Sequence, residues 1–135
     1  MRIDYEYIAK MLDVFLESEL PNIDFNSFKN ELDEDSNKFF FHLILLEEQG
    51  LVAGSSSDPS NIGVRFNGNT GDYMTWIAPL RLTSYGHEFA DALAKPSVTE
   101  VIMDKFQKEG LSAVVDVAKK LAIKQTEKLL QDAIS

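Results

Sequence analysis

The two histidines, His42 and His87, are the residues best suited to acid–base or metal chemistry in this chain. Carboxylates follow both of them, with Glu47 and Glu48 after His42 and Glu88 directly after His87. Imidazole and carboxylate groups together form zinc sites. However, no second ligand stands four residues after His42, where a helical metal motif requires one. We therefore expect the histidines to hydrogen-bond between helices, and we predict no metal and no cofactor.

Three other patterns fall short of known chemical motifs. Ser84 in "LTSYGHEF" lacks the G-x-S-x-G pattern of a hydrolase nucleophile. The glycines of "GNTG" lack the spacing of a phosphate-binding loop. The acidic run Asp33–Asp35 lacks the alternating ligands of a calcium loop. Instead, we expect Ser84 to cap a helix, the glycines of "GNTG" to form turns, and Asp33–Asp35 to lie in solvent at the start of a helix. We predict no catalytic residue and no enzymatic activity.

The composition is that of an ordinary globular domain, but the charge is strongly acidic. The 135 residues are 44% hydrophobic and 26% charged, with a formal net charge of -9. Residues 1–35 hold ten acidic side chains against three basic ones, whereas residues 96–135 are balanced. An acidic amino-terminal half repels phosphate backbones unless a basic patch overrides it. The absence of cysteine excludes disulfides and thiolate metal sites.

The segment "MRIDYEYIAKML" carries charges among its apolar residues, unlike a secretory signal. No later segment has the apolar length of a membrane span. We therefore expect a cytoplasmic protein that does not enter the membrane.

Three helices are predicted in the first fifty residues. Residues 4–18 place Ile8, Leu12 and Phe15 on one face. After a turn at 22–24, a short helix carrying Phe28 and Leu32 is expected, with Asn26 or Ser27 as its cap. The third helix spans residues 36–49, with Ser36 as the expected cap and Gly50 as its stop.

Strands and a hairpin are predicted next. Residues 51–54 form an apolar β-prone run, and residues 62–82 surround the turn signal "NGNTG". We predict that 51–54 and 77–82 pair antiparallel, with a wing between them. In "RLTSYGHEFADAL", Thr83 or Ser84 is expected to cap a helix that buries Phe89 and Leu93. Gly86 is expected to let the first turn of that helix approach a neighbouring element.

Two more helices follow Pro96 in the sequence. Val98, Ile102 and Phe106 define one that ends at Gly110, and residues 111–134 form the last and longest. The fold class expected from this order is mainly α with a small antiparallel β wing. It corresponds to a winged helix-turn-helix domain over residues 1–95, followed by C-terminal helices over residues 96–135.

Four runs carry a resemblance to a known family: "MRIDYEYIAKML", "FHLILLEEQGLV", "RLTSYGHEFADAL" and "GLSAVVDVAKKLA". Over nearly its whole length the chain resembles the bacterial and phage-associated proteins classified as domain of unknown function 2513. The third run is the most specific of the four. The resemblance implies a winged-helix-like fold in a bacterial or mobile-element setting, and it implies no particular chemistry.

The outward face of the helix over residues 36–49 discriminates between kinds of partner. If Phe39, Leu43 and Leu46 face the core, the outer face is apolar with an acid, whereas a DNA-reading helix offers Arg, Lys, Asn or Gln. We therefore expect a regulatory or protein-interaction module, with a sequence-specific DNA-binding regulator as the alternative. The candidate partner- or DNA-contacting residues are Lys38, Phe41, Ile44, Arg65, Trp76 and Arg81.

The last helix is a candidate for self-association, because its apolar face is wide and rich in small residues. The residues expected to form a homodimer are Leu111, Val115, Ala118, Ala122 and Leu129. The alternative is that this helix folds back over Phe41 and Ile44 of its own chain.

Overall fold

The computed structural model describes residues 1–135, which are mainly helical with two small antiparallel sheets. In chain order the elements are α1 (Tyr5–Glu17), the 3-10 helix η1 (Phe25–Phe28), α2 (Lys29–Glu34), α3 (Ser36–Glu48), β1 (Val52–Gly54), β2 (Val64–Phe66), β3 (Tyr73–Thr75), β4 (Leu80–Leu82), α4 (Ser84–Ala94), α5 (Val98–Val101), the π-helical turn η2 (Ile102–Phe106) and α6 (Leu111–Ile134). The helices predicted at the start of the chain, at 36–49 and at 111–134 are confirmed to within about one residue at each end.

The chain divides into two compact units. Unit 1 combines Met1–Asp13 with His87–Ser135, and unit 2 is the continuous segment Val14–Gly86. Helices α1 and α4 each run across a boundary between the units. The domain limit near residue 95 that the sequence suggested stays a prediction.

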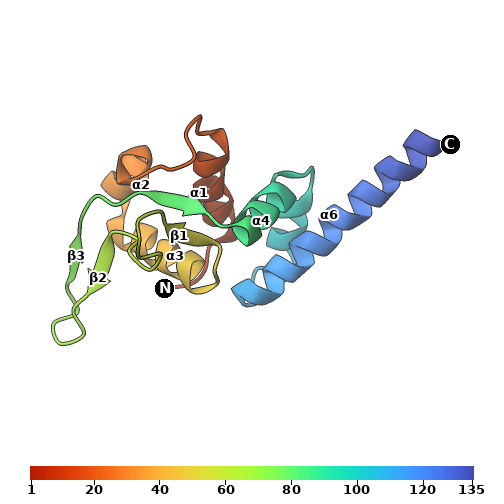
Figure 1. The fold of residues 1–135 in the computed structure, drawn as a ribbon. Coiled ribbons are helices and arrows are strands. Elements are labelled where there is room, and N and C mark those ends of the chain that lie inside the picture. The colour runs from red at the N-terminus through yellow and green to blue at the C-terminus, as the bar shows by residue number, and fades with distance from the viewer. The chain divides into compact units, whose positions relative to one another are not determined.

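The β structure of unit 2 follows the predicted pairing. Strand β1 pairs antiparallel with β4, with Val52 opposite Leu82, which confirms the expected sheet. Strands β2 and β3 form the expected hairpin, which Figure 1 shows reaching beyond β1. The hairpin turn is closed by the amide of Asn67, which donates to the carbonyl of Asp72 over 2.7 Å. We call the segment from β2 to Ile77 the wing.

A single residue before η1 adds a third stretch of backbone to the first sheet. Ile23 donates its amide to the carbonyl of Leu80 and accepts the amide of Leu80 in return, over 2.9 and 2.6 Å. The sequence predicted only a turn at residues 22–24. The turn was expected from local polar residues, whereas the bridge depends on a tertiary partner 57 positions later in the chain.

The core of unit 2 contains a continuous series of aromatic contacts. Phe15 contacts Phe28, and Phe28 contacts Phe39 with ring centroids 4.9 Å apart. Phe39 then meets Phe40, and Phe40 meets Tyr73 of β3 at 5.2 Å. The aromatic core therefore extends from the end of α1 through α3 to the wing.

Two helix caps differ from those predicted. Asp35, not Ser36, caps α3, because its side chain accepts the amide of Lys38 over 3.1 Å from an extended backbone. Asp24, not Asn26 or Ser27, caps η1. Asp, Asn and Ser are all good caps. The residue that caps a helix is the one whose backbone is extended directly before the first turn.

The start of α4 agrees with its prediction. The Thr83 hydroxyl accepts the amide of Gly86 over 2.9 Å and therefore caps this helix. A Cβ built on Gly86 would overlap the carbonyl of Leu51, so the first turn of α4 lies against that backbone. Phe89 and Leu93 are buried, as expected.

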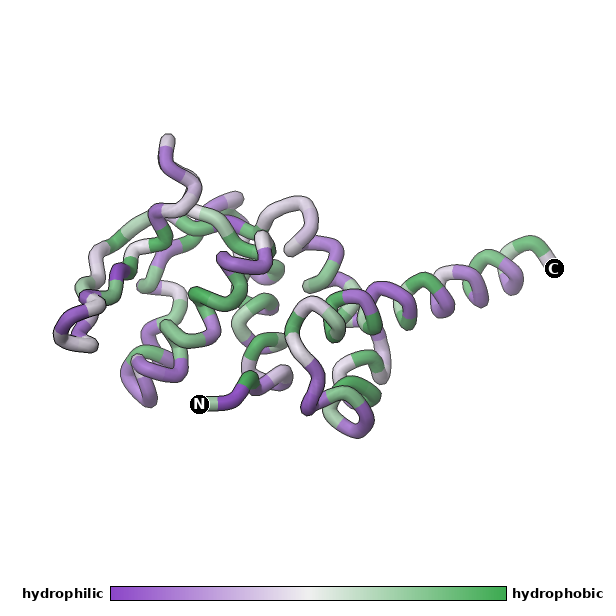
Figure 2. The backbone as a smooth tube through the Cα atoms, turned by 90° about the horizontal axis from the view of Figure 1, so that it is seen from below, coloured by the Kyte–Doolittle hydropathy of each residue, from purple (hydrophilic) through white to green (hydrophobic).

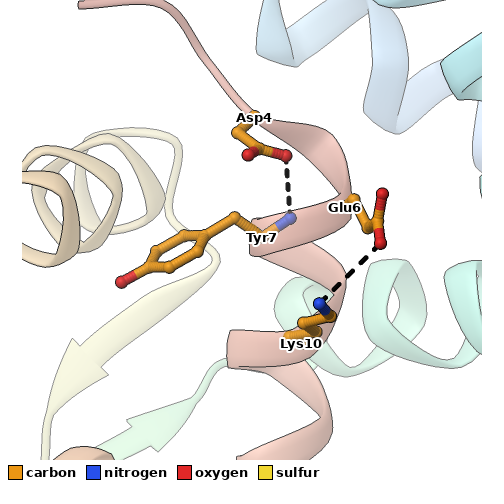
Figure 3. Close-up of polar contacts among 4 residues, drawn as sticks. All are labelled: Asp4, Glu6, Tyr7 and Lys10. Carbon is orange, nitrogen blue, oxygen red and sulfur yellow. Dashed lines mark hydrogen bonds and ion pairs between the residues drawn. The ribbon is translucent and has the colours of Figure 1, made fainter. Parts of the chain in front are cut away.

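The amino-terminal turn of α1 belongs to unit 1. The Asp4 carboxylate accepts the Tyr7 amide over 3.0 Å, and Glu6 pairs with Lys10 over 3.7 Å (Figure 3). The ion pair is exposed and contributes little to stability. Tyr5 is buried, and its hydroxyl donates to the carbonyl of Glu109 over 2.5 Å. This hydrogen bond joins the start of α1 to the turn that precedes α6.

The later helices of unit 1 are less regular than predicted. The helix expected from residue 98 to Gly110 begins as α5 and continues as the π-helical turn η2. In η2 each carbonyl accepts the amide five residues later, one residue further along than in an α-helix. Helix α6 contacts both α5 and η2, and it buries Leu111, Val114, Val115 and Ala118. No helix has the length and apolar character that crossing a membrane requires.

Candidate interaction surface

The wing exposes an unusual number of large apolar side chains. Phe66 is 50% exposed, Met74 69% and Ile77 61%, and the Trp76 side chain is 37% exposed. Exposed Arg65 lies directly opposite Met74 in the hairpin, so the two side chains share one side of the ladder. Phe66 pairs with Tyr73 and therefore lies on the other side of the ladder. We call the set Arg65, Phe66, Met74, Trp76 and Ile77, which takes in both sides of the hairpin, the wing surface.

The wing is anchored to the start of α3 through Tyr73. Its hydroxyl lies 3.0 Å from the hydroxyl of Ser36 and donates to the side-chain oxygen of Asn37 over 3.2 Å. Its ring packs against Phe40 on one side and against Phe66 at 5.4 Å. Because β3 is held by both polar and aromatic contacts, the wing surface has a defined position relative to α3.

The base of the wing is also ordered by hydrogen bonds. The Trp76 amide donates to the carbonyl of Gly63 over 3.0 Å, and its indole N–H donates to the side chain of Asn61 over 2.8 Å. Gly63 has a φ of +84° and leaves no room for a Cβ, which would overlap both the Trp76 carbonyl and the Phe25 ring. The polar end of the indole is therefore satisfied, and its exposed part is carbon.

The outward face of α3 is largely apolar. Phe39, Leu43 and Leu46 are buried, as predicted, and Phe41 and Ile44 are half-buried. Leu45 is also half-buried, and the basic side chain Lys38 is not fully exposed. This helix contains no arginine. Its outer face therefore offers few groups that bind a base edge or a phosphate.

Two carboxylates stand at the last turn of α3. The pKa of Glu47 is raised, mainly by burial and to a lesser extent by the charge of the neighbouring Glu48. The carboxyl end of a helix also carries partial negative charge from its free carbonyls. These charges add to the repulsion of a phosphate backbone at this end of α3.

The three basic candidates come from three separate elements. Lys38 lies near the start of α3, Arg65 in β2 and Arg81 in β4. Strands β2 and β4 belong to different sheets. The Arg81 guanidinium donates to the carbonyl of Leu82 over 3.3 Å, so part of its hydrogen-bonding capacity is used within its own strand.

The two histidines lie in different units and differ in burial. His42 is buried in α3, with its Nδ1 2.8 Å from the carbonyl of Lys38 and its ring against Phe41. His87 is exposed in the first turn of α4. No group of three histidine, aspartate, glutamate or cysteine side chains is arranged to hold a metal ion.

The candidate dimer residues of α6 fall into two groups. Leu111, Val115 and Ala118 are buried within their own chain, so these three are not accessible to a second subunit. Ala122 is half-buried and Leu129 is 64% exposed. Self-association through α6 stays a prediction, and the accessible residues place it in the second half of the helix.

Sequence reasoning found Arg65 and Trp76 but missed the other members of the wing surface. Tyr73 packs against Phe40 and Phe66, whereas Met74 is one of the most exposed apolar residues of the chain. The missed signal was the length of the hairpin. A two-stranded ribbon with apolar residues at neighbouring positions has too little core beneath it to bury both of its sides.

The chain was compared with protein-family models, with curated proteins and with solved structures, and none of them matches.

Proposed function

We propose that this chain is a non-enzymatic protein with a winged-helix-like scaffold that binds another protein through the wing surface. Three helices, a strand, a hairpin and a returning strand follow one another along residues 5–82 in the order of a winged helix. The bridge between Ile23 and Leu80 ties the segment after α1 to the returning strand β4 and is part of the same scaffold. The resemblance to the domain of unknown function 2513 family belongs to the same proposal.

The observation that carries the proposal is the exposed apolar carbon of the wing surface. Phe66, Met74 and Ile77 are each at least half exposed, and they lie within two adjacent segments of the wing. A hairpin that exposes apolar side chains on both of its sides can insert into a groove of another protein, and aromatic residues, methionine and arginine are enriched in protein interfaces. The wing surface contains all three kinds of residue.

The charge of unit 2 indicates the kind of protein that fits. Val14–Gly86 contains eleven acidic and four basic side chains. The matching partner is a protein with an apolar site edged by basic groups, because like charges around an interface oppose association. Arg65 would then meet a carbonyl or an isolated carboxylate of that partner.

A matched pair of wing variants tests this proposal. Met74→Asp places a charge in the wing surface, whereas Asn69→Asp adds the same charge in the hairpin turn. We expect proteins cross-linked to the intact chain in its source cells to be lost with Met74→Asp and retained with Asn69→Asp. Equal recovery with both variants would remove the wing surface from the proposal.

The second candidate function is a sequence-specific DNA-binding regulator. The order of elements favours it, and so do the exposed side chains of Arg65 and Arg81. We expect only weak, unselective and strongly salt-dependent binding, because the outer face of α3 lacks base-reading groups. Anisotropy titration against a random-site DNA pool measures this. Enrichment of one sequence with sub-micromolar affinity at physiological salt would favour the regulator.

A further inference from the structure

The second half of α6 carries exposed apolar side chains that nothing in unit 1 covers. Ile123 is 55% exposed, Leu129 64%, Leu130 60% and Ile134 76%. The first half of the same helix is packed, with Val114, Val115 and Ala118 fully buried. Figure 1 shows the carboxyl-terminal part of α6 extending past α4.

These side chains form one stripe along the helix. At about 100° per residue, the exposed positions and the small residues between them fall on a single face centred on Thr126. The members of this α6 stripe are Ala122, Ile123, Thr126, Leu129, Leu130, Ala133 and Ile134. Lys124, Lys128 and Gln131 lie on the opposite face, and Figure 2 shows the resulting alternation of hydrophobic and hydrophilic positions towards the C-terminus.

The stripe leads into a cleft between α4 and α6. The cleft has a volume of about 420 Å³, and small residues of both helices, Ala92 and Ala122, line it together with Ile123. Its remaining lining residues are the charged side chains Glu88, Asp91, Lys95 and Lys119. An ion pair of 2.9 Å between Glu88 and Lys119 joins the two helices there.

We propose that two copies of this chain pair antiparallel through their α6 helices, each placing the end of its α6 in the α4–α6 cleft of the other. A twofold axis beside Thr126 sets Leu130 of one copy opposite Ala122 of its partner, and Leu129 opposite Ile123. Ile134 then reaches the cleft. Leu130 thereby packs over the small side chain of Ala122, as close helix packing requires, and Leu129 and Ile123 form an apolar pair beside it.

Self-complementarity identifies the occupant as a second copy. The large residues and the cleft that accommodates them lie on the same face of one helix, so a twofold arrangement satisfies both at once. The charges permit this direction, because Lys95 and Lys119 balance Glu88 and Asp91 in the cleft, so the lining does not repel the partially negative carboxyl end of the arriving helix. Because the interface is twofold, each stripe residue is buried once in each copy. Both contributions add to the roughly 1,200 Å² of surface that a specific interface buries.

The α6 stripe lies on unit 1 and shares no residue with the wing surface. Light scattering of the intact chain at micromolar concentration tests it, with two neighbouring variants that add the same group. Leu130→Lys places a charge in the stripe, and Gln131→Lys places it on the opposite face. We expect a dimer for the natural chain and for Gln131→Lys, and a twofold lower mass for Leu130→Lys with unchanged helical content. A monomeric natural chain, or equal masses for the two variants, overturns the proposal.

The orientation has its own test, because the chain has no cysteine. Under oxidation, a mixture of Ala122→Cys and Leu130→Cys chains should form a disulfide between the two variants. Leu130→Cys alone should not, since the two positions 130 are far apart in an antiparallel pair. Cross-linking of Leu130→Cys with itself, and not with Ala122→Cys, would indicate a parallel pair and overturn the register.

Discussion

Gly86 illustrates at the residue scale how a backbone contact determines a residue type. The Leu51 carbonyl accepts the amide of Thr83 over 3.0 Å, and Gly86 in the next turn lies against the same carbonyl. Any side chain at position 86 would push the start of α4 away from the backbone of Leu51, directly before β1. The glycine costs helix propensity of about 1 kcal/mol, and the close approach offsets that cost.

Gly86→Ala is therefore expected to destabilise the protein. The added methyl group meets backbone rather than a flexible side chain, and such overpacking lowers the free energy of unfolding by about 1–3 kcal/mol. Urea denaturation measures the change. Gly68→Ala is the matched control, because a Cβ there meets nothing within 4 Å. Equal stability of the two variants would contradict the packing account.

Tyr5 makes the alkaline stability of the protein sensitive to pH. The pKa of Tyr5 is raised to about 12, mainly by burial and to a lesser extent by the charge of Glu109. The unfolded chain has the ordinary tyrosine pKa of about 10. Between these two values the unfolded state loses the proton while the folded state keeps it, so the contribution of Tyr5 to stability is complete below pH 10 and declines as pH rises.

Tyr5→Phe should therefore be less stable than the natural chain at pH 8, by about 1 kcal/mol for the lost hydrogen bond to Glu109. The gap between the two proteins should narrow as pH rises above 10 and reverse before pH 12, because a pKa difference of about two units outweighs the lost hydrogen bond. Chemical denaturation at a series of pH values measures it. A gap that stays constant across this range would show that Tyr5 ionises equally in both states.

At the scale of elements, local patterns were enough for the helices and for the pairing of β1 with β4. Apolar periodicity and the turn chemistry of "NGNTG" are local properties that the fold retains. The bridge at Ile23 was missed because it depends on a partner far along the chain, and the π-helical turn η2 was missed because apolar spacing does not distinguish it from an α-helix. The candidate surface was predicted only in part for the same reason, since exposure of Met74 depends on how much core lies beneath the hairpin.

The cap of α3 provides a prediction at this scale. Asp35→Ala removes the side chain that accepts the Lys38 amide and the negative charge beside the positive end of the helix. We expect a loss of about 1 kcal/mol in the free energy of unfolding. Asp33→Ala removes an equally exposed acid from α2 and is the control. If both variants lose the same stability, net charge rather than capping explains the change.

At the scale of the whole molecule, the net charge of -9 opposes the folded state. Ten of the 22 acidic side chains lie in residues 1–35, and Glu31, Asp33, Glu34 and Asp35 stand within five positions of one another. Concentrated like charge raises the energy of a compact chain, and the same charge disfavours nucleic acid as a partner. The acidity therefore affects both stability and the choice of partner.

Moderate salt is consequently expected to stabilise this protein. Raising NaCl from about 0.01 to 0.15 M shortens the Debye length from about 30 to about 8 Å, which screens repulsion between neighbouring carboxylates more than it weakens short contacts. We expect the thermal midpoint to rise by a few degrees, as measured by circular dichroism. A variant with Glu31→Lys and Asp33→Lys should show a smaller rise because the two new cations balance the remaining acids Glu34 and Asp35. A midpoint that falls with salt in the natural chain would mean that favourable ion pairs, such as Glu88 with Lys119, outweigh the repulsion.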